Sequence, residues 1–124
     1  MSIKHDIPYS ALERIFHEPN RLAIMSALCG STEGLTFNEL KEECALTDGN
    51  LSRHVKALEE AKAIKVEKSF VKSRPQTTIH LSETGHEKFL EYLKALEEVL
   101  QKASRGLAPE KKTDSLPIGK TAST

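Results

Sequence analysis

Residues 50–61 have the sequence NLSRHVKALEEA, and this stretch decides the fold of the chain. Its apolar side chains are spaced four and three positions apart, which places them on one side of an α-helix. They are Leu51, Val55 and Leu58. Thr47, just upstream, is a good N-cap because its hydroxyl can accept a hydrogen bond from a backbone N–H group of the first turn. We therefore predict a helix over about residues 48–61.

The other side of this predicted helix carries the residues that can contact a binding partner. At about 100° per residue, the positions that point away from the apolar side are Gly49, Ser52, Arg53, Lys56 and Glu60. Arg53 can place two donors on O6 and N7 of a guanine. Phosphates or base edges are within reach of Asn50, Ser52 and Lys56. His54 lies beside the apolar side, so we interpret it as a structural residue.

A shorter helix precedes this one. Thr36 and Glu39 have the spacing of a capping box, which predicts a helix over about residues 37–43. Because the connection to the next helix is very short, we predict a helix-turn-helix over about residues 36–61. Thr36 is also an expected DNA contact.

Two further helical segments are predicted upstream, over residues 9–16 and 20–29. They are expected to be interrupted at Glu18-Pro19, because proline disrupts a helix interior. These segments supply apolar side chains to the core and serve as scaffold.

A β-hairpin is predicted after the helix-turn-helix. Ile64–Lys68 and Thr77–Leu81 both alternate apolar and polar residues, which is typical of strands, so we expect a wing over about residues 64–81. The tip is expected to be long, with Pro75 stiffening it. Around Pro75, the side chains that offer donors to phosphates or the minor groove are Lys72, Ser73, Arg74 and Gln76.

The charges are distributed unevenly along the chain. The whole sequence has 18 basic and 18 acidic residues and a formal net charge of zero. Between residues 50 and 76, however, seven basic side chains accompany three acidic ones, so this part has a net charge of +4. Affinity for phosphates comes from locally concentrated Lys and Arg, and this distribution therefore favours double-stranded DNA as a partner.

A last helix is predicted over about residues 83–105, capped by Ser82. Its apolar side chains recur at spacings of three and four and form a wide stripe. A short winged helix offers limited surface for so many apolar groups, so we expect part of the stripe to contact a second copy of the chain. The residues expected at this homodimer interface are Phe89, Tyr92, Leu93, Leu96, Val99 and Leu100.

Residues 35–85 resemble the winged-helix domain of the MarR/ArsR-type bacterial and archaeal regulators, especially the compact single-domain group. The similarity is carried by LTFNEL at 35–40, NLSRHVKALEEA at 50–61, RPQTT at 74–78 and LSETG at 81–85. The resemblance implies a mainly α fold with a small β-hairpin, the winged helix-turn-helix. It also implies sequence-specific operator binding by a dimer whose terminal helices pair, usually to repress transcription.

Two features depart from that family pattern. Lys62 stands where similar sequences usually have Gly, so either Lys62 adopts a left-handed cap at a cost of about 1 kcal/mol or the helix ends differently. The chain also lacks the paired cysteines or Cys/His cluster of metal-sensing relatives. His80 and His86 have no supporting carboxylate or Cys ligand in sequence, so no metal and no other cofactor is inferred.

Length and composition bound the remaining possibilities. With 124 residues, 38% hydrophobic and 29% charged, the chain is expected to form one winged-helix domain over residues 1–105, followed by a disordered tail over 106–124. The apolar runs are too short to cross a membrane, and the N-terminus lacks a secretory signal, so we expect a cytoplasmic protein. Cys29 and Cys44 are interpreted as small core residues.

Two other classes of function were weighed against DNA binding. An enzyme is disfavoured because the sequence offers no nucleophile with a matched base and no phosphate-binding glycine loop, so no catalytic residue is assigned. The stronger alternative is a winged helix that contacts another protein, with the basic wing as an ordinary solvated surface. The operator sequence and any small-molecule effector remain unknown from the sequence.

Overall fold

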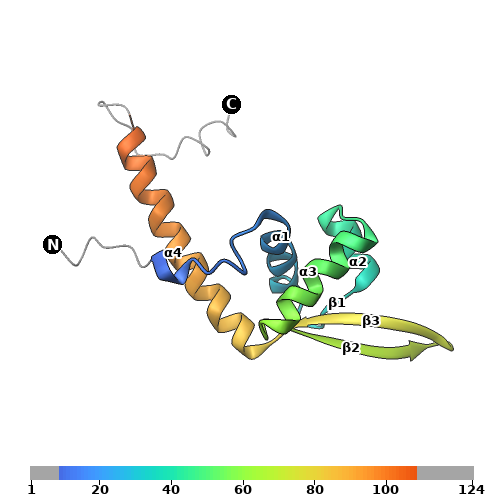
Figure 1. The fold of residues 1–124 in the computed structure, drawn as a ribbon. Coiled ribbons are helices and arrows are strands. Elements are labelled where there is room, and N and C mark those ends of the chain that lie inside the picture. Colours follow the sequence, from blue (N-terminus) through green and yellow to red (C-terminus); the bar gives the residue numbers. More distant parts are fainter. Residues whose placement is uncertain (1–8, 109–124) are drawn as a thin grey trace.

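The computed structural model describes residues 9–108, which form a winged helix with a long C-terminal helix (Figure 1). The elements in chain order are η2 (Tyr9–Ala11), α1 (Pro19–Cys29), β1 (Leu35–Thr36), α2 (Phe37–Cys44), α3 (Asp48–Glu60), β2 (Ile64–Val71), β3 (Arg74–Leu81) and α4 (Glu83–Leu107). The predicted fold class, mainly α with a small β-hairpin, is confirmed.

The three strands form one antiparallel sheet in the order β1-β3-β2. Strand β2 pairs with β3 along its whole length, from Ile64 opposite Leu81 to Val71 opposite Arg74. Strand β1 pairs with β3 at only two positions, where Leu35 lies opposite Ile79 and Thr36 lies opposite Thr78. The sequence did not predict β1, because two residues are too few to show the alternation of a strand.

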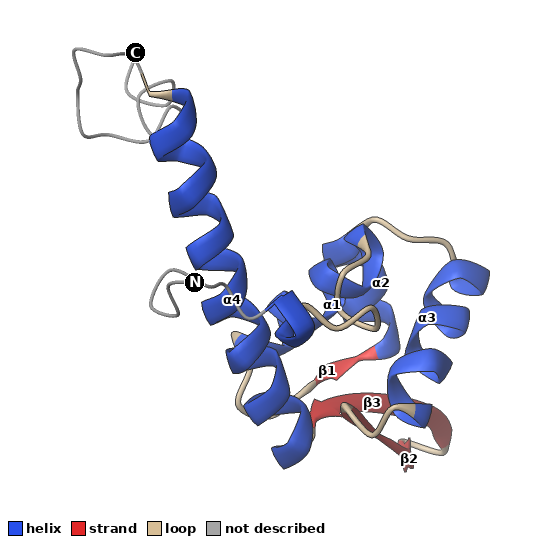
Figure 2. Ribbon diagram, turned by 60° about the vertical axis from the view of Figure 1, so that its left-hand side comes forward, coloured by secondary structure: helices blue, strands red, loops and turns tan. Residues whose placement is uncertain are grey.

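The core lies between α1, α2, α3, the base of the hairpin and the first half of α4 (Figure 2). Its fully buried apolar side chains are Phe16, Ile24, Met25, Leu28, Leu40, Leu51, Leu58, Ile79, Phe89 and Tyr92. Phe16 makes edge-on contacts with Phe89 and Tyr92, at centroid distances of 5.3 and 5.7 Å. Aromatic packing therefore joins the segment before α1 to α4.

The predicted helix over residues 9–16 is wrong. The structure has a single 3₁₀ turn at Tyr9–Ala11, and α1 begins at Pro19 rather than after it. Proline is favourable there because its fixed φ suits the first helical position and its missing N–H would be unpaired anyway. Glu18 is the N-cap and accepts a hydrogen bond from the backbone N–H of Arg21 at 2.8 Å. The Arg21 side chain also donates to the carbonyl of Ile15 at 2.6 Å and so fixes the preceding loop.

The predicted long tip of the hairpin is also wrong. Strands β2 and β3 continue to Val71 and Arg74 and are joined by only two residues, Lys72 and Ser73. Both have positive φ, 55° and 65°, as a type I′ turn requires. Such turns match the twist of the flanking strands but usually carry Asn or Gly, which is why the sequence did not predict one here.

The junction between α3 and β2 is held by the start of α4. Lys62 has φ of 64°, so of the two alternatives it adopts the left-handed conformation. Ser82 donates from its hydroxyl to the Lys62 carbonyl at 2.8 Å and from its backbone to the Ala63 carbonyl at 3.1 Å. A Cβ on Gly85 would clash with the Ala63 carbonyl oxygen, so the first turn of α4 packs directly on this junction.

Other boundaries and burial differ in detail. Helix α3 ends at Glu60, and α4 continues to Leu107, so the tail predicted from residue 106 begins within a helix. The rest of that predicted tail, residues 109–124, lies outside the described residues. Neither cysteine is fully buried: Cys29 is exposed at the end of α1 and Cys44 is half-buried. None of the helices within residues 9–108 combines the length and apolar character that a membrane span requires.

Candidate nucleic-acid interface

Helix α3 exposes the polar side that the sequence predicted. Asn50, Ser52, Arg53 and Lys56 are all exposed, whereas Leu51, Val55 and Leu58 are buried on the other side. A Cβ on Gly49 would have no heavy atom within 4 Å, so the first turn of α3 is open to a close approach. The predicted orientation of this helix is confirmed.

One hydrogen bond orients Arg53 on this surface. Its Nη2 donates to Oδ1 of Asn50 at 2.7 Å, one turn earlier on the same helix. A guanidinium has five N–H donors in a planar fork, so this contact uses one and limits the directions of the others. An arginine that is already oriented loses less conformational entropy when it binds a base edge.

The start of α3 is fixed by its connection to α2. Ala45 ends α2 in the left-handed conformation, with φ of 55°, and the backbone N–H of Leu46 donates to the carbonyl of Lys41 at 3.0 Å. Lys41 also forms an ion pair with Asp48 at 2.8 Å. Thr47 caps α3 by accepting from the N–H of Asn50 at 3.1 Å. The turn therefore sets the angle at which α3 leaves α2.

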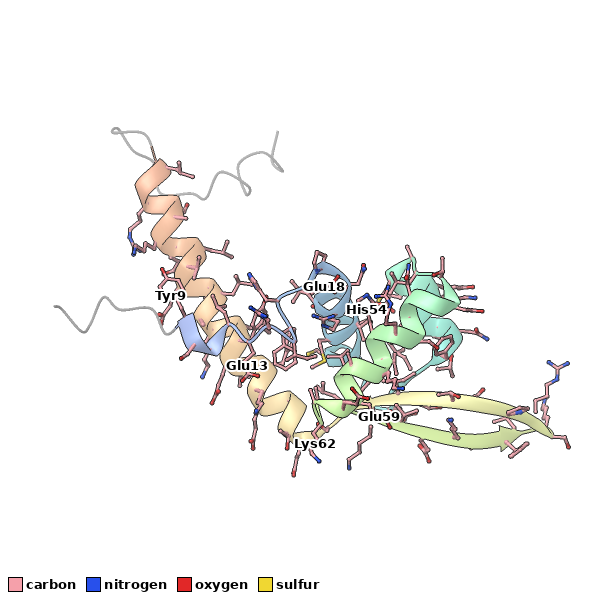
Figure 3. All side chains as sticks on the ribbon, viewed as in Figure 1. Tyr9, Glu13, Glu18, His54, Glu59 and Lys62 are labelled. Atoms are coloured by element: carbon pink, nitrogen blue, oxygen red, sulfur yellow. The ribbon has the colours of Figure 1, made fainter. Side chains whose placement is uncertain are left out.

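His54 anchors the back of α3 to the N-terminal end of α1. It is 5% exposed, and its Nδ1 lies 3.3 Å from Nη1 of Arg21 and 4.0 Å from a carboxylate oxygen of Glu18. Figure 3 shows Glu18 and His54 close together between the two helices. Burial lowers the pKa of His54, Glu18 partly opposes this, and Arg53 and Arg21 lower the pKa further. Its interpretation as a structural residue is confirmed.

The wing tip and the start of α2 enclose a groove of about 510 Å³. On the α2 side the groove is lined by Thr36, Phe37 and Asn38, and on the wing side by Val71, Lys72, Arg74, Pro75, Gln76 and Thr77. Four expected DNA contacts from two separate stretches of sequence are therefore brought together: Thr36, Lys72, Arg74 and Gln76. Ser73 is exposed in the turn and does not line the groove.

The N-terminal end of α2 also faces this groove. Thr36 accepts from the N–H of Glu39 at 3.1 Å, and Glu39 accepts from the N–H of Thr36 at 2.9 Å, so the predicted capping box is present. The N-terminus of a helix has a partial positive charge, which favours an anion nearby.

Exposed basic side chains are concentrated on α3 and the wing. All seven basic side chains between residues 50 and 76 are exposed. Of the three acidic groups there, Glu67 lies 3.0 Å from Nε2 of His80. Three other carboxylates, Glu39, Glu42 and Glu43, line a separate hollow on α2 together with Leu35. The net charge of zero for the whole sequence therefore conceals a local excess of exposed basic groups on α3 and the wing.

Two exposed residues near the wing were not predicted as contacts. Asn38 lines the groove two residues after the α2 cap Thr36, and only its place in the first turn of the helix could have indicated it. Phe70, near the end of β2, is 75% exposed. Its signal in the sequence was an aromatic residue next to a basic turn, which was hidden by the expectation of a loop there.

Helix α4 divides the expected dimer residues into two groups. Phe89 and Tyr92 are 2% and 0% exposed in the core of their own chain, so neither offers the exposed apolar surface that was expected of it at a homodimer interface. The Tyr92 hydroxyl is also within 2.8 Å of Nδ1 of His17. Leu93 and Leu100 are 38% and 51% exposed, and Leu96 and Val99 are half-buried.

No three His, Cys, Asp or Glu side chains gather as a metal site would require within residues 9–108.

Comparison with known proteins agrees with this geometry. A family model described as a winged helix DNA-binding domain matches residues 20–100. An uncharacterized protein of Methanocaldococcus jannaschii is 40% identical over 80 residues, which are 64% of this chain and 86% of that protein. A winged-helix, DNA-binding fold is the class that these matches define. The chain belongs to the winged helix DNA-binding domain family.

Solved structures of transcription regulators have a similar fold. A transcriptional regulator homologue from Pyrococcus horikoshii is similar with a TM-score of 0.69 and 27% identity, over 76% of this chain and 93% of that one. MarR of Staphylococcus aureus, solved with salicylate and kanamycin, has a TM-score of 0.68 and 19% identity, over 93% of this chain and 75% of that one. This chain therefore has the fold that these two transcription regulators share.

Proposed function

We propose that this chain is a homodimeric, sequence-specific regulator that binds duplex DNA and represses transcription from the cytoplasm. The observation that carries the proposal is the exposed side of α3, on which Asn50 orients Arg53 beside Ser52 and Lys56. In this proposal α3 enters the major groove, where an arginine can bind both O6 and N7 of a guanine.

The wing and the start of α2 supply the contacts that position the protein on the DNA. Lys72 and Arg74 are exposed at the wing tip, and they line the same groove as the N-terminal turn of α2. Lysine, arginine and helix N-termini are the groups that typically hold phosphates. A DNA backbone passing along this groove would meet all three.

The second half of α4 supports a dimer. Buried residues of this helix end at Ala95, and Figure 1 shows the helix projecting beyond the rest of the domain. From Leu93 onward, apolar residues recur at alternating spacings of three and four, the repeat of a helix that packs against another helix. They are Leu93, Leu96, Leu100, Ala103 and Leu107. A second α4 would cover this stripe, and the two α3 helices would then reach successive major grooves.

Repression is the simplest outcome of such binding, because a dimer across two grooves occupies DNA that the transcription machinery needs. Specific binding distinguishes this function from the alternative, a winged helix that contacts another protein.

The test compares Arg53→Ala with Lys72→Ala on a selected duplex and a scrambled one, at several salt concentrations. Arg53→Ala should lose about 1–3 kcal/mol of binding free energy on the selected duplex. It should also reduce the ratio of the affinities for the selected and scrambled duplexes. Lys72→Ala should weaken both duplexes similarly and reduce the salt slope by about one.

Lys94→Ala, at an exposed lysine of α4, is the matched control and should bind like wild type. Circular dichroism confirms that each variant is folded. If folded Arg53→Ala binds both duplexes like wild type, the proposal that α3 is the recognition helix is wrong. If wild type shows no salt-sensitive DNA binding, the protein-contact alternative is favoured.

A further inference from the structure

The wing carries an apolar surface close to its tip. Phe70 is 75% exposed and lies directly opposite Pro75, which is also exposed. Opposite residues of an antiparallel pair share one side of the hairpin, so the aromatic and proline rings are neighbours. Val71 is 45% exposed but pairs with Arg74 on the other side.

Nothing in the described chain covers this part of the hairpin. Strand β1 pairs with β3 only at Thr78 and Ile79, and from Glu67 to Pro75 every residue is exposed. Figure 1 shows the hairpin extending away from the helices, on the side opposite α4. The neighbouring rings of Phe70 and Pro75 therefore form a small apolar surface that is accessible to a partner.

The surrounding charges indicate which partner fits. Lys68 lies two residues before Phe70 on the same side of β2, Lys72 lies in the turn, and Arg74 directly follows the turn. A second wing tip would bring the same cations together and be repelled. In the minor groove of duplex DNA, the apolar edges and stacked faces of the bases lie between two phosphate backbones. An apolar surface surrounded by cations is complementary to that arrangement.

We propose that Phe70, supported by Pro75, is an apolar wedge that enters the minor groove and partly unstacks one base step, while Lys68, Lys72 and Arg74 hold the flanking phosphates. This inference rests on the proposed DNA binding and deepens it by naming what the wing recognises. Proteins that insert Phe or Pro into the minor groove kink the duplex by about 20–90°. The wedge would favour flexible pyrimidine–purine steps at the position it meets, without a hydrogen bond to a base.

The wedge and the phosphate contacts differ in their response to salt. An apolar contact releases no counterions, so Phe70→Ala should lower affinity at every salt concentration and leave the salt slope unchanged. We expect about a ten-fold loss on the selected duplex, because most of the ring is buried on insertion. Phe70→Leu keeps an apolar side chain and should recover part of the loss.

The experiment uses the full chain and a selected duplex with a fluorophore at each end. Energy transfer between the fluorophores should rise when wild type binds, because the duplex bends, and should rise less with Phe70→Ala. 2-Aminopurine, placed in turn at each step of the minor groove, should brighten at one position with wild type but not with Phe70→Ala. Ser69→Ala is the control, since it shortens an exposed side chain next to Phe70 on the other side of the same hairpin, outside the groove, and it should bind like wild type.

The outcomes separate this inference from the proposed function. If wild type binds with salt dependence but the duplex stays straight, and Phe70→Ala binds equally well, the wedge is overturned and the DNA-binding function stands. If Ser69→Ala loses as much affinity as Phe70→Ala, a general change in the hairpin explains the loss and the wedge is again overturned. If light scattering shows that Phe70→Ala changes the oligomeric state, Phe70 contacts protein instead. Absence of any DNA binding by wild type overturns both.

Discussion

A single buried histidine connects the recognition surface to the rest of the molecule. His54 is on α3, one residue after Arg53, and its ring lies against Arg21 of α1 at 3.3 Å. Since Arg21 can only donate, Nδ1 of His54 accepts, and the neutral ring is the form that fits. A protonated ring would lose this hydrogen bond and place a second cation beside Arg21. Glu18, at 4.0 Å, compensates only in part.

This arrangement predicts loss of stability in mild acid. Folding lowers the pKa of His54 below its ordinary value of 6.5, mainly through burial. As pH falls through about 6.5, the unfolded chain therefore binds a proton that the folded chain does not, and the free energy of unfolding decreases. The contribution of neutral His54 to the free energy of unfolding is therefore complete above about pH 6.5 and is lost progressively below it.

Thermal melting at about pH 7.5 and pH 5.5 checks this, with His54→Gln as the variant because an amide oxygen can still accept from Arg21. The melting temperature of wild type should fall more between the two pH values than that of His54→Gln. His86→Gln, at an exposed histidine of α4, should keep the wild-type response. Equal pH responses for wild type and His54→Gln would contradict the role of His54.

For single residues, the sequence predicted which side chains of α3 are exposed, but it did not predict their hydrogen-bond partners. The four-and-three spacing of Leu51, Val55 and Leu58 was enough to orient α3 and to expose Arg53. The hydrogen bond from Arg53 to Asn50 was not predicted. Helical spacing indicates on which side of the helix a residue lies, but it does not determine the rotamer of its side chain. The contact between His54 and Arg21 joins residues 33 positions apart, and nothing local in either segment signals it.

At the scale of elements, the helices were predicted because their ends carry strong local signals. Thr36, Thr47 and Ser82 each accept from a backbone N–H three residues later, and each begins a predicted helix. The hairpin turn and the segment over residues 9–16 were missed. In the turn, Lys72 and Ser73 adopt positive φ values that residues with a Cβ usually avoid. In residues 9–16, tertiary contacts override the helical preference of the local sequence.

The junction between α3 and β2 offers a test of such strain. Lys62 has φ of 64°, a conformation that costs a residue with a Cβ about 1 kcal/mol relative to glycine. Lys62→Gly should therefore raise the free energy of unfolding by up to about 1 kcal/mol, measured by urea denaturation. Lys62→Ala is the matched control, because it removes the same charge but retains the Cβ, and it should show no comparable gain.

An equal gain for Lys62→Ala and Lys62→Gly would show that charge, rather than backbone strain, determines stability at this position. The junction matters for function because it joins the recognition helix to the wing. Ser82 and Gly85 hold it against the start of α4, so α3, the hairpin and α4 move as connected parts.

For the whole molecule, α4 serves two purposes along its length. Its first half is part of the core, through Phe89 and Tyr92. Its second half carries an apolar stripe that the described chain covers only in part, since Leu96 packs against the core whereas Leu100 and Leu107 are 51% and 77% exposed. The sequence predicted the stripe but not this division, because the helical repeat is continuous and does not show where the domain ends.

The division allows dimerisation to be tested without unfolding the chain. Leu93 and Leu100 are 38% and 51% exposed, so glutamate at both positions removes little of the core. It places charges in the proposed interface between two α4 helices, where burial would be costly. The double variant Leu93→Glu/Leu100→Glu should keep the wild-type circular dichroism spectrum and be monomeric by light scattering at concentrations where wild type is a dimer.

The same variant should lose DNA affinity only where two copies act together. A dimer joins two recognition helices, so binding of the second to a palindromic duplex is effectively intramolecular and raises affinity by about 10²-fold or more. Leu93→Glu/Leu100→Glu should lose that factor on the palindrome and bind a single half-site like an isolated wild-type domain. Gln101→Glu adds a charge elsewhere on α4 and should remain dimeric. If the double variant is still a dimer with full affinity for the palindrome, the α4 stripe is not the interface, and another surface must bring the two recognition helices together.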